Sequence, residues 1–195
     1  MNRSISIARY LMIANNISAK VRPAAVAGLF YPGNENDLRN TVQKYLQSAG
    51  EGEREFKIAI DEISAIRMFI VPHAGYIYSG KTAAFAYQLL NKFKNKIRRV
   101  LMLGPAHRVL LTGAALPESD SFETPLGQIK LDKELVEKIL EDYSWITVND
   151  QAHAEEHCLE VQLPFLQETI NDFKIVPLLV GDIDSELLAQ MILKY

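Results

Sequence analysis

Short apolar runs alternate with amphipathic helical patterns along most of this chain. The apolar runs are predicted to be buried strands, and they cover residues 68–71, 99–103, 113–116, 145–148 and 174–180. The helical patterns place apolar residues three and four positions apart, and they cover residues 35–47, 81–93, 132–142, 155–169 and 185–193. Strands that alternate with helices are typical of an α/β protein. We therefore predict a three-layer α/β/α fold with a largely parallel or mixed sheet.

Two of the predicted helices carry terminal signals. Asp132 precedes an apolar stripe formed by Leu135, Ile139 and Leu140, and an aspartate in that position can cap the first turn. Pro164 has no backbone N–H to donate, so it is expected to kink the helix at 155–169 or to begin a new segment there.

The composition is that of an ordinary globular protein. The chain has 195 residues, of which 48% are hydrophobic, which suffices for one domain with a sizeable core. Its 21 basic and 24 acidic residues give a net charge of −3, which argues against a nucleic-acid-binding surface. No apolar run approaches the ~20 residues that a membrane span needs. The single cysteine, Cys158, cannot form an intramolecular disulfide, which favours a cytoplasmic location.

The N-terminal segment differs from the rest of the chain. No acidic residue precedes Glu35, and Arg9 interrupts the apolar run at 5–13. The segment also lacks the small-residue cleavage site of a secretory signal. We predict that residues 1–21 are a poorly ordered N-terminal extension and that the domain covers residues 22–195.

His73 and His107 each follow a predicted buried strand. His73 lies two residues beyond the first of these strands and His107 four residues beyond the second. In open α/β sheets the functional crevice lies outside the carboxyl ends of the strands, so both imidazoles are expected at one edge of the sheet. Neutral imidazole suits iron, copper and zinc. The sequence therefore predicts a metal site at His73 and His107, although a hydrogen-bonded structural role for either histidine stays open.

The second histidine pair lies in His153-Ala-Glu-Glu-His157. It matches the H-x-x-E-H pattern of inverted zinc peptidases, in which two histidines share a helix face and Glu156 would be the general base. The pattern is short, and it needs a third ligand further along the chain. The alternative is a surface or capping histidine, His153, beside a site histidine, His157.

Glu160 lies three residues after His157, which places both on one face of the predicted helix. Such a pair can transfer protons or orient a ligand, and we predict His157 and Glu160 as catalytic residues. An ordinary helical pair is the alternative. Cys158 points away from that face and is predicted to be a small core residue.

The chain resembles the Memo family in the order and spacing of six motifs. These are Arg22-Pro-Ala to Tyr31-Pro32, Val71-Pro-His-Ala-Gly-Tyr76, Leu103-Gly-Pro-Ala-His107, Phe122-Glu-Thr-Pro-Leu-Gly127, Glu156-His-Cys-Leu-Glu-Val-Gln-Leu-Pro-Phe165 and Ile175-Val-Pro-Leu-Leu-Val-Gly181. The resemblance runs from Arg22 to the end of the chain. It is closest to the bacterial and archaeal members called AmmeMemoRadiSam system protein B, which are encoded with a radical-SAM protein.

The resemblance implies a fold similar to the catalytic subunit of class III extradiol dioxygenases, which cleave catechol rings with Fe(II). It implies that His73 and His107 are ligands of Fe(II) or copper and that His157 lines the same pocket. It also implies a radical-SAM partner protein.

The chain departs from the family pattern at its C-terminus. Family members continue for about another third, and that part is expected to supply a cysteine as the third metal ligand. Here the third ligand is expected beyond Tyr195, so the domain at 22–195 lacks the family's C-terminal third. Cys158 also stands where serine is usual.

Three functions follow from these observations. The first is a metal-dependent redox enzyme that acts on O2 or a small molecule. The second is a non-catalytic module that binds a small molecule, peptide or protein in the same pocket. The third is the zinc peptidase.

Overall fold

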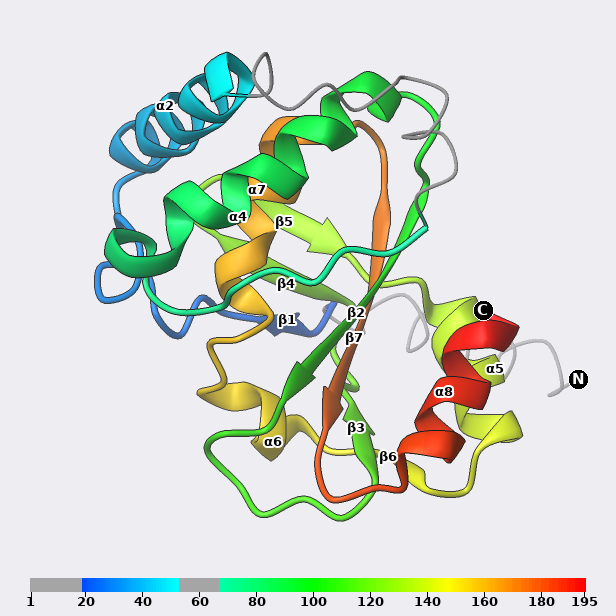
Figure 1. The fold of residues 1–195 in the computed structure, drawn as a ribbon. Helices are drawn as coiled ribbons and strands as arrows, with labels where there is room; N and C mark the ends of the chain where they lie inside the picture. Colours follow the sequence, from blue (N-terminus) through cyan, green and yellow to red (C-terminus); the bar gives the residue numbers. More distant parts are fainter. Residues whose placement is uncertain (1–18, 53–66) are drawn as a thin grey trace, which may run out of the picture.

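The computed structural model describes residues 19–52 and 67–195, and these form a mixed α/β structure with two sheets flanked by helices (Figure 1). The predicted fold class is confirmed. Most of the predicted N-terminal extension, residues 1–18, lies outside the described residues, whereas Val21 already belongs to strand β1 (Val21–Arg22).

The main sheet has four strands in the order β2-β7-β3-β6. Their bounds are Arg99–Pro105 for β2, Lys174–Val180 for β7, Ala114–Leu116 for β3 and Ile146–Val148 for β6. The pairs β2–β7 and β3–β6 are parallel, whereas β3 and β7 are antiparallel. The sheet is therefore mixed, and all four strands lie within or close to predicted ones.

A second sheet of three strands was not predicted. It has the order β1-β4-β5, with β4 at Ser121–Thr124 and β5 at Gly127–Lys130. The two-residue connection between β4 and β5 makes an antiparallel hairpin, and β1 runs parallel to β4. Strands of two to four residues give too short a hydrophobic pattern to stand out in the sequence.

The main sheet separates two hydrophobic layers. Successive side chains of a strand point to opposite faces, and β7 follows this rule. Ile175 and Leu179 pack in one hydrophobic cluster, whereas Val176 and Leu178 pack in the other. The first cluster includes helices α2 (Glu35–Gly52), α4 (Tyr76–Leu90) and α7 (Leu163–Thr169). The second includes α5 (Lys133–Asp142) and α8 (Ser185–Lys194), on the other side of β2 and β7 in Figure 1.

The terminal signals of α5 are confirmed. The side chain of Asp132 accepts a hydrogen bond from the backbone N–H of Leu135 at 3.3 Å, and Ile139 is fully buried on the inner face. Other boundaries differ by a few residues. Helix α4 begins at Tyr76 instead of residue 81, and a 3-10 turn, η1 (Asn91–Phe93), follows it.

The strand predicted at 68–71 was wrong. These residues belong to no strand, and the side chain of Ile70 is 96% exposed. Residue composition indicates an extended apolar segment, but burial also needs a neighbouring strand. Among the described residues, β2 pairs only with β7, and no strand pairs with 68–71.

The single helix predicted at 155–169 was also wrong. Helix α6 (Asp150–Ala154) ends just before this region, which contains a 3-10 turn, η2 (Glu160–Gln162), and then α7. Pro164 lies in the first turn of α7, so its predicted role as the start of a new segment is confirmed. The residues between α6 and η2 form a turn, which places His157 outside any helix.

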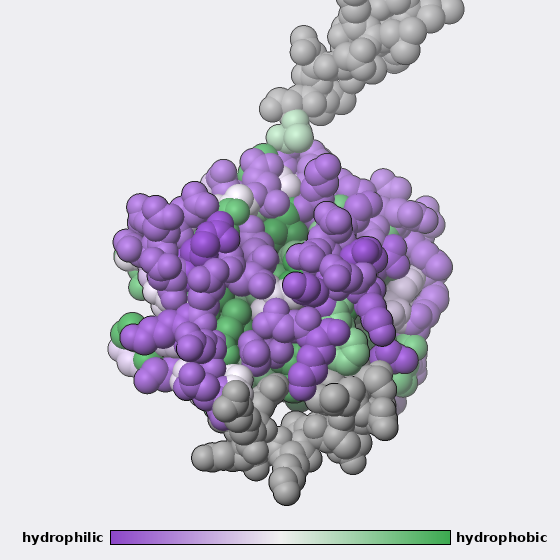
Figure 2. Space-filling model, turned by 90° about the horizontal axis from the view of Figure 1, so that it is seen from above, coloured by the Kyte–Doolittle hydropathy of each residue, from purple (hydrophilic) through white to green (hydrophobic). Residues whose placement is uncertain are grey.

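The surface is mostly hydrophilic on the face seen from above. Figure 2 shows hydrophobic residues mainly in gaps between hydrophilic ones and at the rim of that face. In the part of the chain that the structure describes, no helix has the length and apolar character to cross a membrane.

Candidate metal centre

Three imidazoles from distant parts of the chain meet at one place. His73 precedes α4, His107 follows β2, and His157 lies in the turn after α6. The ring centroids are 5.3 Å apart for His73 and His107, 4.7 Å for His107 and His157, and 6.1 Å for His73 and His157. The predicted convergence of His73 and His107 is therefore present, and His157 joins them.

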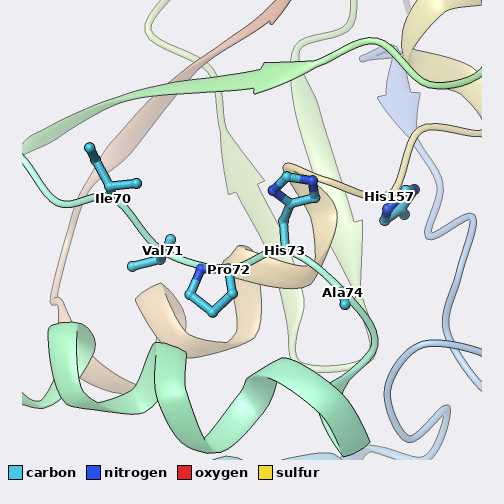
Figure 3. Close-up of a pocket in the computed structure, with 6 residues that line it drawn as sticks. All are labelled: Ile70, Val71, Pro72, His73, Ala74 and His157. Atoms are coloured by element: carbon cyan, nitrogen blue, oxygen red, sulfur yellow. The ribbon is translucent and has the colours of Figure 1, made fainter.

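An open pocket exposes this site to solvent. It is lined by Ile70, Val71, Pro72, His73, Ala74 and His157. Figure 3 shows the ring of His73 turned away from the helix that follows it, with the ring of His157 beside it. The backbone N–H of Tyr76 donates to Phe30 O at 2.7 Å and so fixes the start of α4 next to the pocket.

The end of β2 packs tightly against the turn that carries His157. The thiol of Cys158 donates to Pro105 O at 3.2 Å. A Cβ atom at Gly104 would lie 2.5 Å from Cys158 Sγ and 2.8 Å from Leu159 Cδ2, so only glycine permits this approach. Burial raises the pKa of the Cys158 thiol, and the residue is a core residue as predicted.

The carboxylate of Glu156 holds His107 and His157 in place. It accepts hydrogen bonds from the backbone N–H groups of His107 at 2.6 Å, His157 at 2.9 Å and Cys158 at 3.0 Å. It also lies 2.9 Å from Nδ1 of the His107 ring. Burial alone would raise the pKa of Glu156, but the hydrogen bonds from His107 and Cys158 outweigh it and lower the pKa to about 2.

Glu156 therefore stays ionised and orients the ring of His107. A carboxylate on Nδ1 leaves Nε2 free for another partner, which is the usual arrangement behind metal-binding histidines. Nδ1 of His157 is buried and lies 3.2 Å from the same carboxylate, outside hydrogen-bonding geometry, with no hydrogen-bond partner among the described residues. Burial lowers the pKa of His157, and the charge of Glu156 offsets part of that effect.

A second grouping overlaps the first. His107, Glu156 and His157 each offer a ligand atom within 4.8 Å of the others. However, the oxygens of Glu156 already accept three backbone N–H groups, which favours an orienting role over direct coordination. His73 is the better candidate for a ligand beside His107, because its ring faces the same place and carries no competing hydrogen bond among those described.

Glu160 and His157 do not lie on one helix, contrary to the prediction. Its carboxylate is fully buried and forms an ion pair with Arg22. It also accepts hydrogen bonds from the hydroxyl of Tyr31 and from the backbone N–H groups of Ala25 and Val26. The 3-10 turn η2 begins at Glu160 in place of the continuous helix that the prediction required. The geometry thus gives Glu160 a structural role.

The H-x-x-E-H geometry is absent as well. Helix α6 ends at Ala154, so His153 and His157 do not lie on one helix face. His153 is 2% exposed, and its Nε2 lies 3.0 Å from Ala115 O. Since Glu156 is already bound to backbone N–H groups, it is not placed as the base of a zinc peptidase.

His153 makes stability depend on pH. Burial lowers its pKa from 6.5 to about 4, although the contact with Ala115 O opposes the shift. The folded protein therefore binds this proton more weakly than the unfolded chain does. Above about pH 6.5, protonation of His153 costs the folded protein nothing. The free energy of unfolding should then fall by roughly 3 kcal/mol as the pH drops to about 4. Urea denaturation across that range measures the loss.

The matched variant is His153→Gln, whose amide can still donate to Ala115 O but does not titrate. We expect its stability to vary less than that of the wild type over the same range. Glu156 adds its own loss of stability mainly below about pH 4.5, because its pKa falls from 4.5 to about 2 in the folded protein. Equal slopes in wild type and His153→Gln would show that another group is responsible.

Sequence reasoning missed two site residues. Glu156 was considered only as a peptidase base, because its partner His107 lies far away in the sequence. Phe30, whose ring centroid is 4.6 Å from that of His157, gave no signal beyond its place in an aromatic turn.

Comparisons with known proteins identify the family of this chain. Residues 22–195 match the family model described as Memo-like protein. The chain is 36% identical over 164 residues to a MEMO1 family protein of Thermoplasma volcanium, which covers 83% of this chain and 56% of the relative. It is 38% identical over 169 residues to a MEMO1 family protein of Aquifex aeolicus, with coverage of 86% and 58%. A memo-1 homolog of Caenorhabditis elegans is 32% identical over 176 residues, with coverage of 89% and 47%.

The chain thus spans about half the length of these relatives. The matched region includes all three site histidines and Glu156. The family resemblance noted in the sequence is confirmed, and the chain belongs to the Memo-like family.

Proposed function

We propose that this Memo-family chain binds Fe(II) or copper at His73 and His107 and takes part in redox chemistry. The observation that carries the proposal is the approach of these two rings to 5.3 Å, with an ionised carboxylate behind one of them. The two residues come from distant parts of the chain, and His73 lines the open pocket with its ring next to that of His107. Packing alone gives no reason for part-exposed imidazoles to gather there.

The spacing of the rings fits a shared ion. With nitrogen–metal distances of about 2.0–2.1 Å, as for zinc, two imidazoles on one ion have centroids roughly 5 Å apart. The pairs His73–His107 and His107–His157 agree with that value, and His73–His157 at 6.1 Å is wider. Neutral imidazole is a good donor for both Fe(II) and copper.

The residues of the chain take distinct parts in this proposal. His73 and His107 hold the ion, and Glu156 fixes the tautomer and direction of His107. His157 is proposed as the acid–base group that contacts a bound substrate, because it lines the same pocket. When bound, Fe(II) or copper would supply open coordination positions and one-electron chemistry.

The proposal extends to partners and location. The family resemblance supports a radical-SAM protein as the partner. A buried, unpaired cysteine supports a reducing, cytoplasmic location.

Anaerobic loading with Fe(II) or Cu(I) tests the proposal, with metal content measured by mass spectrometry. We expect about one ion per chain, as one site would bind. In the diamagnetic Cu(I) form, the NMR ring signals of His73 and His107 should shift most, and those of His153 should stay in place as an internal control. A folded protein that takes up no metal would contradict the proposed function.

A non-catalytic binding module is the second candidate. The apolar wall of the pocket favours it, since Ile70 is almost fully exposed beside Val71 and Ala74. An exposed apolar surface of this kind is typical of ligand or protein contacts. Metal content separates the two functions, because the binding module does not need the ion.

A further inference from the structure

The segment that carries His73 is not part of any sheet, so something else must fix its position. Residues 67–74 form no strand or helix. Their connection to the body of the protein includes a hydrogen bond to Pro72 O, the carbonyl directly before His73. The donor is Nε2 of Gln162, at 3.2 Å.

Gln162 also contacts the other half of the site. Its Nε2 donates to Cys158 O at 3.4 Å, one residue after His157. Its Oε1 accepts a hydrogen bond from the hydroxyl of Tyr87 at 2.8 Å. Both Gln162 and Tyr87 are buried, so this amide has a partner on each side.

The orientation of the amide follows from its partners. A carbonyl oxygen can only accept a hydrogen bond, so the NH2 group must face Pro72 and Cys158. The hydroxyl of Tyr87 then donates to the amide oxygen. Turning the amide over would place an oxygen against two carbonyl oxygens, which the buried setting would penalise strongly.

We infer that Gln162 is a positioning residue for the metal site: its single side chain sets the spacing between the His73 segment and the His157 turn. The inference rests on the proposed function. Gln162 is not one of the residues that line the pocket, and it acts through the backbone carbonyls of Pro72 and Cys158. Tyr87, held by stacking on Phe165 with ring centroids 5.0 Å apart, in turn fixes Gln162.

Two variants of Gln162 test this role. Gln162→Met keeps the length of the side chain and removes both donated hydrogen bonds. Gln162→Glu keeps an acceptor for Tyr87 but puts a carboxylate oxygen where the NH2 group was. We expect both to lower Cu(I) affinity by about 10–100-fold in competition with a chelator, the usual effect of losing a partner that orients ligands.

A matched control separates positioning from general loss of stability. Thr169 is buried, and its hydroxyl donates to Phe165 O at 2.7 Å, within helix α7. Thr169→Val removes that buried hydrogen bond, and we expect its Cu(I) affinity to stay within about twofold of wild type, because the site is untouched. Tyr87→Phe should have an intermediate effect, since Gln162 keeps its donors but loses its anchor.

A measurement on the metal-free protein tests the role of Gln162 separately from metal binding. In the metal-free protein, the NMR ring signals of His73 should shift in both Gln162 variants, while those of His153 stay in place. Wild-type protein that binds no metal would contradict the proposed function, and the His73 signals would still test Gln162. Unchanged His73 signals, or Cu(I) affinities in both Gln162 variants equal to that of Thr169→Val, would overturn the inference.

Discussion

Replacing Glu160 with alanine should destabilise the protein by about 3–5 kcal/mol, the cost of leaving a buried charge without its partner. The substitution would strand the guanidinium of Arg22, which is only 6% exposed. It would also leave the hydroxyl of Tyr31 and the N–H groups of Ala25 and Val26 without their acceptor. Chemical denaturation measures the change in free energy of unfolding.

The arrangement around Arg22 explains why the loss should be large. Besides Glu160, Arg22 donates to His153 O and Glu156 O, at 2.9 Å and 2.7 Å from the same nitrogen. Its guanidinium lies 5.1 Å from the centroid of the Phe122 ring. The ion pair thus joins β1 and the turn at 25–31 to the segment that carries Glu156 and His157. Metal affinity is expected to fall together with stability in this variant.

An exposed ion pair provides the control. Glu118 pairs with Lys20 at 2.6 Å, and both side chains are more than half exposed. Glu118→Ala should cost far less than Glu160→Ala, because solvent screens such pairs. If the two substitutions lowered the free energy of unfolding equally, the buried cluster would not be a main support of the fold.

The main sheet could be predicted from the sequence because its strands can be located from their own apolar residues, without knowledge of the strands that pair with them. The runs that became β2 and β7 each begin with a basic residue and are otherwise mostly apolar, so composition located them. The run at 68–71 has a similar composition, yet it is unpaired and exposed in the described structure. Its burial depends on a partner strand, which a local pattern does not encode.

The helix predicted at 155–169 failed for a different reason. The residues of this stretch are largely buried, as the apolar pattern indicated. Two of the buried residues, however, are the carboxylates Glu156 and Glu160. Each is satisfied by donors from distant segments, His107 in one case and Arg22 in the other. These contacts stabilise a turn and a 3-10 segment in place of a regular helix. The position of His107 could be predicted from the end of β2. His73 lies beside it although the strand expected before it is absent, and the long-range partners of the carboxylates could not be predicted.

Removing the imidazoles of His73 and His107 together should abolish metal binding while leaving the fold intact. The expected content falls from about one ion per chain to background, because imidazole is the main donor of the site. The stability cost should stay below about 1 kcal/mol, since neither ring is in the core and the His107 side chain is 38% exposed. Mass spectrometry after anaerobic loading and urea denaturation measure the two quantities on the same samples.

His153→Gln is the control for the double variant, because it removes a histidine that lies outside the metal site. It alters a core histidine and should change the dependence of stability on pH, yet it should keep metal content at the wild-type level. A general effect of losing histidines would lower metal content in both variants. If the His73→Ala, His107→Ala double variant kept its metal, the ion would have to bind elsewhere in the chain. We expect the double variant to lose its metal and His153→Gln to keep it. That result would assign His73 and His107 to the metal centre and His153 to the core, in agreement with their burial.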